Sequence, residues 1–159
     1  MSLTFLTSSA AETEEVALQL AHLLRPGDTI ALKGDLGAGK TTFVRGIARA
    51  LNADVPATSP TFSLINHLPG NIPIIHMDAY RLASSNDLYD LGFYDLAVDS
   101  AVLIVEWADR IIEALSENCI LVEITPINAD SDERHISISS AATPVMSRID
   151  ALKGIIEHG

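Results

Sequence analysis

The 159-residue sequence has little cysteine and no long apolar stretch. Its single cysteine, Cys119, cannot form an internal disulfide, which agrees with a reducing compartment. Its apolar runs are much shorter than the ~20 residues that cross a bilayer, and its N-terminus lacks the basic segment of a signal peptide. We therefore expect a soluble, cytoplasmic protein with no membrane role.

Cationic side chains are also scarce, with ten Lys and Arg against twenty-one Asp and Glu and a formal net charge of −11. Such a charge repels phosphodiester backbones, so the chain should not bind nucleic acids non-specifically, whereas a basic protein partner is compatible with it. The sequence also lacks repeats, low-complexity tracts and linkers. Because a chain of this length can bury an independent core, we expect residues 1–159 to form a single domain.

Hydrophobic periodicity predicts strands that alternate with helices, which is typical of an α/β layered fold. Ser9 and Glu12 have the capping-box spacing that begins a helix. We expect strands at 3–6, 29–32, 102–105, 120–125 and 135–139, two more strands that turn at 69–71, and helices after Ser9, at 40–51, near 87–91, at 108–115 and after Pro144. The predicted fold is a three-layer α/β sandwich. Its central sheet should be mixed and mainly parallel, with antiparallel strands toward the C-terminus and a helical tail at 144–159.

The stretch GDLGAGKTTF satisfies the P-loop pattern G-x-x-x-x-G-K-[ST] with Gly34, Gly39, Lys40 and Thr41. The expected strand before it and the expected helix after it are the context that this pattern requires. Glycines allow backbone N–H groups to surround an anion, and the helix N-terminus adds partial positive charge. Lys40 would contact the β- and γ-phosphates, and the Thr41 hydroxyl would bind Mg²⁺. The sequence therefore predicts a nucleotide site, in a three-layer sandwich of the P-loop NTPase type.

Two acidic residues stand at the ends of apolar runs, Asp78 in IPIIHMD and Glu106 in AVLIVEW. A carboxylate at the carboxyl end of a buried parallel strand faces the crevice where α/β sheets bind ligands, which favours Glu106 as a direct or water-mediated Mg²⁺ ligand. The sequence does not separate the roles of the two acids.

Weaker signals come from other residues. Ser59, Pro60 and Thr61 form either a simple turn or a loop that senses the γ-phosphate. Trp107 is interpreted from the residues alone as a packing side chain. The five histidines lack metal-ligand spacing, which favours structural or surface roles for them, and Cys119 is expected to be a small core residue.

Five segments occur in an order and at separations that resemble the TsaE family, formerly called YjeE. They are GDLGAGKTTF, SPTFSLIN, HMDAYRL, LGFYDL and VLIVEW, and the match covers about residues 3–139. This family is the ATPase of bacterial tRNA threonylcarbamoyladenosine synthesis. The chain departs from the family pattern after the tryptophan, where Ala108 and Asp109 replace the usual Pro and Glu, and no function is assigned to that pair.

The resemblance implies roles for individual residues. Lys40, Asp78 and Glu106 would be catalytic, and Thr41 and Glu106 would hold Mg²⁺. ATP would be bound by Gly37, Ala38, Gly39, Lys40, Thr41, Thr42 and Trp107. Thr61 and Arg81 belong to matching motifs with less defined roles.

The resemblance also implies a partner, a TsaB–TsaD heterodimer in which TsaD modifies adenosine 37 of tRNA. The protein would then be an accessory ATPase that meets tRNA only indirectly, in agreement with its acidic charge. The alternatives are a small-molecule kinase and a binding module that ATP gates without hydrolysis. A GTPase is disfavoured because the chain has no N-K-x-D segment. With Gln19 as its only glutamine and no recognised arginine finger, the sequence predicts slow ATP turnover by the isolated protein.

Overall fold

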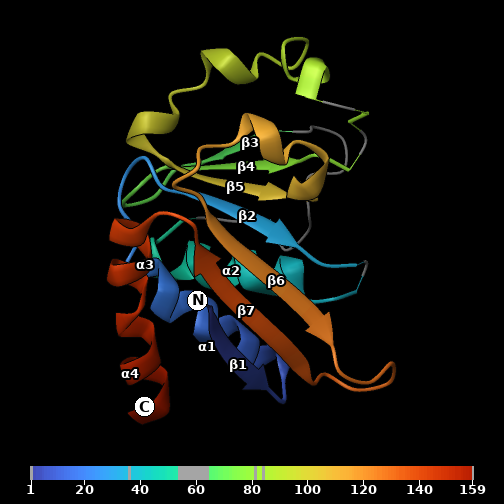
Figure 1. The fold of residues 1–159 in the computed structure, drawn as a ribbon, viewed down its shortest axis with the longest axis vertical. Coiled ribbons are helices and arrows are strands. Elements are labelled where there is room, and N and C mark those ends of the chain that lie inside the picture. Colours follow the sequence, from blue (N-terminus) through green and yellow to red (C-terminus); the bar gives the residue numbers. More distant parts are fainter. Residues whose placement is uncertain (1, 36, 54–64, 81, 84, 159) are drawn as a thin grey trace.

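The computed structural model describes residues 2–35, 37–53, 65–80, 82–83 and 85–158. Within these residues, seven strands form one sheet in the order β1-β7-β6-β2-β5-β4-β3 (Figure 1). The strands are β1 (Leu3–Thr7), β2 (Thr29–Lys33), β3 (Ile65–Leu68), β4 (Ile74–Asp78), β5 (Val102–Glu106), β6 (Ile120–Pro126) and β7 (Arg134–Ser140). The central neighbours β6, β2, β5 and β4 are parallel, whereas β1, β7 and β3 pair antiparallel at the edges. The predicted α/β fold with a mixed sheet is confirmed.

Four α-helices accompany the sheet in the described part of the chain: α1 (Ala10–Ala21), α2 (Lys40–Ala50), α3 (Thr143–Ile149) and α4 (Ala151–His158). The predicted start of α1 is confirmed, because the Ser9 hydroxyl accepts a hydrogen bond from the Glu12 N–H at 3.1 Å. The Glu12 carboxylate in turn accepts from the Ser8 N–H. The first bond satisfies an N–H group that a helix N-terminus otherwise leaves open, and the second joins Glu12 to the residue before the N-cap.

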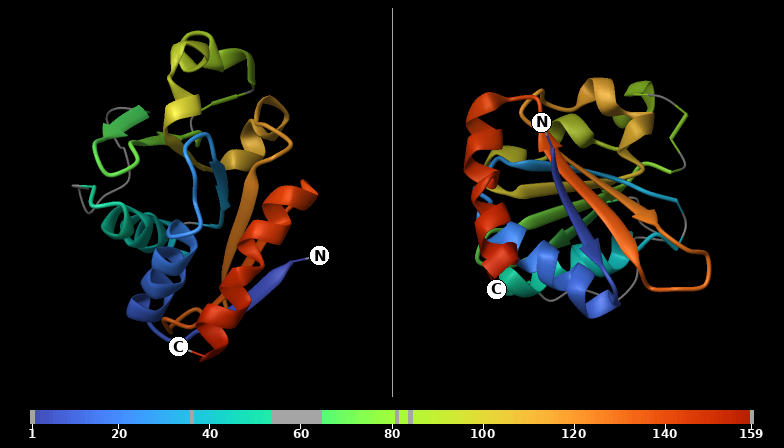
Figure 2. Two further views of the ribbon diagram at one scale, coloured as in Figure 1. Left: turned by 90° about the vertical axis from the view of Figure 1, so that its left-hand side faces the viewer. Right: turned by 60° about the horizontal axis from the view of Figure 1, so that its bottom comes forward.

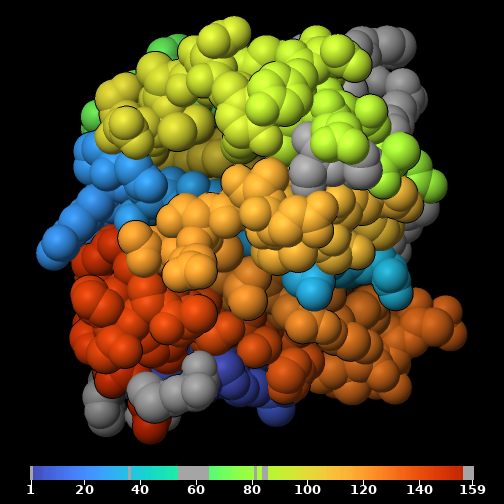
Figure 3. Space-filling view, turned by 45° about the horizontal axis from the view of Figure 1, so that its top comes forward, coloured from blue at the N-terminus to red at the C-terminus, as the bar shows by residue number. Residues whose placement is uncertain are grey.

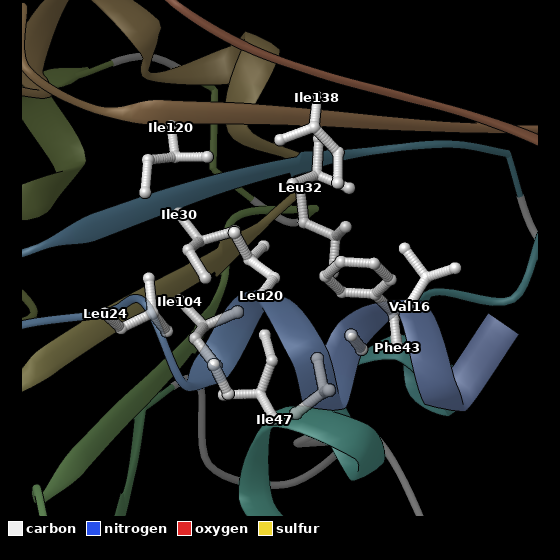
Figure 4. Close-up of a cluster of buried hydrophobic side chains, with 14 of the residues drawn as sticks. Val16, Leu20, Leu24, Ile30, Leu32, Phe43, Ile47, Ile104, Ile120 and Ile138 are labelled. Carbon is white, nitrogen blue, oxygen red and sulfur yellow. The ribbon is translucent and has the colours of Figure 1, made fainter. Parts of the chain in front are cut away.

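The first two helices pack closely together on one face of the sheet (Figure 2). Gly46 of α2 allows this approach, because a Cβ atom there would collide with the Glu14 carbonyl oxygen and the Ala17 side chain of α1. The core that the two helices cover contains Leu20, Phe43 and Ile47, all fully buried (Figure 4). Burying one such side chain contributes roughly 1.5–3 kcal/mol, so this helix pair fixes α2 firmly against the sheet.

The central strands contribute alternate residues to two separate cores. In β5, Ile104 faces the α1/α2 side, whereas Leu103 and Val105 face the opposite side. All five residues of β5 are buried, as expected for a parallel strand that is covered on both faces. Burial on both faces thus explains why residues 101–105, AVLIV, are all apolar.

The second face is covered by short 3₁₀ turns, and two sequence predictions are wrong here. The helices expected near 87–91 and at 108–115 are instead 3₁₀ turns at Ser85–Leu88, Phe93–Asp95, Val98–Ser100, Ala108–Arg110 and Ile112–Ala114. Ile111 explains the second case, because its backbone leaves the helical region at φ −133° while its side chain is fully buried in the second core. Near the first segment, Gly92 takes a left-handed conformation at φ 74° and redirects the chain.

The C-terminal helices α3 and α4 lie at the end of the sheet opposite the carboxyl ends of the parallel strands (Figure 1). Their residues Val145, Met146, Ile149 and Leu152 join the first core. Arg148 forms two hydrogen bonds with the Asp28 carboxylate, at 2.7 and 2.8 Å, and donates to the Leu23 carbonyl oxygen at 2.7 Å. The tail is therefore attached to the loop between α1 and β2. Among the described residues, no helix has the length and apolar character needed to cross a membrane.

Candidate active site

The P-loop joins β2 to α2 at the carboxyl end of the parallel strands. Gly39 precedes the first helical residue with φ 109°, a left-handed conformation that a side chain would strain. Gly39, at the N-cap position, has no side chain with which to cap this helix. The first N–H groups of α2 and its partial positive charge are therefore directed at the position where an anion would bind.

Lys40, the first residue of α2, is almost completely buried. Its ammonium group donates a hydrogen bond to the carbonyl oxygen of Gly34, the first glycine of the loop. The same nitrogen lies 3.7 Å from the centre of the Trp107 ring, which is cation–π geometry. Desolvation lowers the pKa of Lys40, although nearby Glu106 and Asp78 oppose that change.

The two predicted acids lie side by side at the ends of neighbouring strands. Asp78 of β4 is opposite Glu106 of β5 in the sheet register, and Glu106 is also opposite Leu32 of β2, close to the P-loop. This arrangement follows from the strand order, because β5 separates β4 from the P-loop strand. Strand pairing thus brings two carboxylates and the P-loop to one edge of the sheet, as the sequence predicts.

Glu106 is buried and is hydrogen-bonded to His76, which also comes from β4. The His76 Nε2 atom lies 2.6 Å from Glu106 Oε2, and the two side chains are 4% and 2% exposed. An ionised carboxylate can only accept hydrogen bonds, so in that state the imidazole N–H donates to it. Sequence analysis gave His76 a structural role at most. The sequence signal for this contact was the spacing H-x-D. Residues two positions apart in a strand face the same side of the sheet, so His76 shares that side with Asp78.

Asp78 is the less enclosed of the two acids, with partial exposure to the pocket. Burial raises its pKa, and the neighbouring Glu106 adds to that shift, whereas a hydrogen bond from the Tyr80 N–H acts in the opposite direction. Two adjacent, partly desolvated carboxylates are stabilised by a cation between or near them. Together with the Thr41 hydroxyl, this set of oxygen donors fits a Mg²⁺ ion, which prefers oxygen ligands.

Trp107 has a left-handed backbone, with φ 58° and ψ 40°. Non-glycine residues rarely adopt this conformation, which costs roughly 1–2 kcal/mol. It turns the chain sharply after Glu106 and places the indole beside Lys40. The Tyr80 ring lies 4.9 Å from the Trp107 ring at 54°, so the two aromatic residues form one wall of the site.

These groups line one pocket with a volume of about 450 Å³, within the usual range for small-molecule sites. Its lining includes all the predicted site residues except Ala38: Gly37, Gly39, Lys40, Thr41, Thr42, Asp78, Glu106 and Trp107. Ala38, which belongs to the P-loop, is itself fully buried. The chemistry of the pocket is that of a phosphate and cation site, with helix N–H groups and one lysine facing two carboxylates.

Comparison with known proteins now identifies the family. The sequence profile described as Threonylcarbamoyl adenosine biosynthesis protein TsaE matches residues 7–136. The chain belongs to the TsaE family. It is 38% identical over 135 residues to the tRNA threonylcarbamoyladenosine biosynthesis protein TsaE of Bacillus subtilis strain 168, which covers 84% of this chain and 83% of that protein. The TsaE protein of Treponema pallidum strain Nichols is 36% identical over 116 residues, 73% of this chain and 86% of its own.

A solved TsaE-like structure has the same fold. The crystal structure of Bacillus subtilis YdiB superposes with a TM-score of 0.74 at 32% sequence identity, covering 96% of this chain and 95% of that one. The resemblance inferred from the five sequence segments is thus confirmed at the level of the family and of the fold.

Sequence reasoning missed some residues that line the pocket, among them Arg134. Arg134 begins β7 and lines the pocket from the side opposite the acids' strands. Its guanidinium donates to two P-loop carbonyl oxygens, Ala38 at 2.8 Å and Gly37 at 3.1 Å. It also donates to its own hairpin, to Ser131 at 2.8 Å and Glu133 at 2.9 Å. Arg134 therefore holds the β6–β7 hairpin against the P-loop.

Some predicted residues lie outside the described part of the chain, namely Ser59, Pro60, Thr61 and Arg81. Their suggested roles stay predictions. Within the described residues, no group of three or more His, Cys, Asp or Glu side chains is arranged to hold a metal ion. Any Mg²⁺ here would thus depend on the P-loop threonine, the nucleotide and water in addition to the acids.

Proposed function

We propose that this protein is an ATP-binding and ATP-hydrolysing accessory protein of tRNA N6-threonylcarbamoyladenosine-37 modification, acting with a TsaB–TsaD pair. The observation that carries the proposal is the joint placement of the P-loop, Asp78 and Glu106 around one pocket in a chain of the TsaE family. Related proteins are named for threonylcarbamoyladenosine biosynthesis. Membership of that family favours this reading over a small-molecule kinase.

In the proposed mechanism, the N–H groups of Gly37, Gly39 and the first turn of α2 bind the phosphate chain. The Lys40 ammonium leaves the Gly34 carbonyl oxygen to neutralise phosphate oxygens. Thr42, which also lines the pocket, lies one residue further into the helix and contacts the phosphate nearer the nucleoside. Trp107 and Tyr80 restrict water on the side of the acids.

Thr41 and Glu106 would hold Mg²⁺, which neutralises developing charge on the phosphates when it is bound. His76 fixes the Glu106 carboxylate from behind, since their hydrogen bond joins two buried side chains. Asp78, which is more open to the pocket, is placed to orient or deprotonate the attacking water. Its raised pKa makes it a stronger base than an ordinary aspartate.

Hydrolysis by the isolated protein should be slow. Among the described residues that line the pocket, the cationic side chains are Lys40 and Arg134, and Arg134 is occupied by four backbone carbonyl oxygens. An arginine that stabilises the transition state can contribute roughly 10³–10⁵ in rate. We therefore propose that the TsaB–TsaD pair completes the site or orders its surroundings.

The test is phosphate release from Mg·ATP by wild type, Glu106→Gln and Lys40→Ala, each with and without purified TsaB–TsaD. We expect slow wild-type turnover, stimulation by the pair, loss of turnover with retained ATP binding in Glu106→Gln, and weakened ATP binding in Lys40→Ala. Unchanged ATP affinity in folded Lys40→Ala would contradict the P-loop assignment. Nucleotide binding without phosphate release under any condition would favour the non-hydrolytic binding module.

A further inference from the structure

All three tyrosines of the chain lie within residues 80–94, and all three are exposed. The relative exposures are 74% for Tyr89, 53% for Tyr94 and 47% for Tyr80. The Tyr89 and Tyr94 rings contact each other at a centroid distance of 4.6 Å, and Phe93 meets Tyr94 edge-on at 5.3 Å. A clustered, exposed pair of tyrosines is a typical anchor for protein interfaces, since these side chains offer a large contact area at a small entropic cost.

The charged residues of the chain around the tyrosine pair are all acidic. Residues 82–109 contain six Asp and Glu and no Lys, Arg or His. Asp90, Asp95 and Asp99 are exposed on the same segment. We call Tyr89, Asp90, Tyr94, Asp95 and Asp99 the tyrosine–aspartate patch. The segment 85–100 that carries it forms a continuous part of the surface (Figure 3).

The patch is anchored to the body of the protein from below. Leu88 is fully buried beneath it, and Leu82 is buried where the segment leaves β4. Asp87 accepts a hydrogen bond from the Ala83 N–H at 2.8 Å, which closes the turn before the patch. A surface held in this way is preorganised, which lowers the entropic cost of binding a partner.

The chain just before this segment adjoins the candidate active site. Tyr80 lines the pocket and packs on Trp107, and the Arg110 guanidinium lies 5.4 Å from the centre of the Tyr80 ring. Arg110 in addition donates to the Leu82 carbonyl oxygen at 3.5 Å. Tyr80, which precedes the segment, thus already accepts an arginine over its face, the interaction that Tyr89 and Tyr94 offer to a second molecule.

We propose that the tyrosine–aspartate patch is the docking surface for a cationic protein surface, with Arg or Lys side chains over the two tyrosine rings and paired with the three aspartates. The proposal rests on the proposed function in assigning that cationic surface to the TsaB–TsaD pair. Such a pair must bind the polyanion tRNA and therefore carries Lys and Arg. Nucleic acid and anionic lipid are disfavoured as occupants because the patch has only negative charge, and a second copy of the same acidic patch would be repelled.

The test measures the affinity of the protein for purified TsaB–TsaD by titration calorimetry at 50 and 300 mM salt. The variants are Tyr89→Ser/Tyr94→Ser and Asp95→Lys/Asp99→Lys, all at exposed positions. The matched control is Glu117→Lys/Asp150→Lys, which makes the same change in net charge at exposed positions outside the patch. Calorimetry with ADP provides a second measurement that the patch should not affect.

We expect each patch variant to weaken binding to the pair roughly tenfold or more, because interface anchors of this type commonly cost that much. ADP affinity should be unchanged, the control should bind as wild type does, and the lysine variant should lose most of the salt dependence. Patch variants that bind as tightly as wild type would overturn the patch while leaving the proposed function intact. Absence of binding by the wild-type protein would contradict the proposed function and the assigned partner together. Binding of tRNA or self-association that the patch variants abolish would also overturn the proposal.

Discussion

The link between Arg134 and the P-loop predicts a specific effect of removing that side chain. In Arg134→Ala, the carbonyl oxygens of Gly37 and Ala38 lose their partners, and the hairpin loses its attachment to the loop. Ala38 is fully buried, so its carbonyl oxygen is poorly placed to recruit a replacement from solvent. The loop glycines then regain the conformational freedom that Arg134 removes.

The magnitude follows from the hydrogen bonds. A bond from a charged donor contributes about 1.5–3 kcal/mol when it is enclosed, and the Gly37 bond is exposed and should lie at or below the lower limit. We expect the two P-loop bonds together to contribute about 2 kcal/mol, part of it to global stability and part to P-loop order. If about 1.4 kcal/mol of this is required for phosphate binding, ADP affinity falls tenfold.

The assay is ADP calorimetry on wild type, Arg134→Ala and Arg134→Lys, with urea unfolding of each protein. Lysine keeps the positive charge but loses the fork that binds two carbonyl oxygens, so Arg134→Lys should resemble Arg134→Ala if loop geometry is the cause. If charge alone attracts the nucleotide, Arg134→Lys should resemble wild type. Arg49→Ala is the control, since it breaks an exposed pair with Glu14 away from the loop. A folded Arg134→Ala protein with wild-type ADP affinity would refute the reasoning.

Other perturbations test the rest of the site and the tail. Asp78→Asn should raise the melting temperature of the protein at pH 7 while abolishing hydrolysis. The pKa of Asp78 is raised in the folded protein, so its ionised form destabilises the fold, and this destabilisation disappears as the pH falls through that pKa. A lower melting temperature would contradict this sign. Trp107 emission should change on ADP binding, because phosphate competes for the Lys40 ammonium beside the indole, whereas an unaltered spectrum at saturation would make Trp107 a packing residue. Arg148→Ala should lower the free energy of unfolding by about 2 kcal/mol in urea, because it leaves the Asp28 carboxylate partly buried without its partner, and an unchanged midpoint would show that apolar packing alone holds the tail.

Local patterns were sufficient to predict several parts of this structure. Each of these patterns depends on neighbours within a few residues: the capping box at Ser9, the spacing of glycines in the P-loop, and the acids at strand ends. Most residues that line the pocket at the P-loop and the acids could therefore be named before any tertiary contact was known. The same local reasoning failed for 108–115, where apolar spacing suits a helix but Ile111, which is buried in the second core, has a backbone outside the helical region.

The contacts that sequence reasoning missed all join distant segments. Arg134 contacts the P-loop residue Ala38, which lies 96 residues earlier in the sequence. His76 and Glu106 are 30 residues apart and meet only because β4 pairs with β5 in a particular register. No periodicity within one strand specifies that register. Such pairs depend on strand order, which the sequence pattern leaves open among several arrangements.

The electrostatics of the pocket explain why phosphate and Mg²⁺ should bind together. Lys40 is surrounded by carboxylates, and Glu106, Asp78, Asp35 and Asp109 all act to keep it protonated. A nucleotide brings several more negative charges into the same enclosed space, where like charges interact more strongly than in water. Among the described residues that line the pocket, Lys40, Arg134 and the helix N-terminus cannot balance this excess. Mg²⁺ can balance it, because the ion neutralises the acids and the phosphates at once. Nucleotide affinity should therefore fall when the metal is chelated. In Asp78→Asn, where one of the repelling charges is absent, the affinity without metal should recover in part.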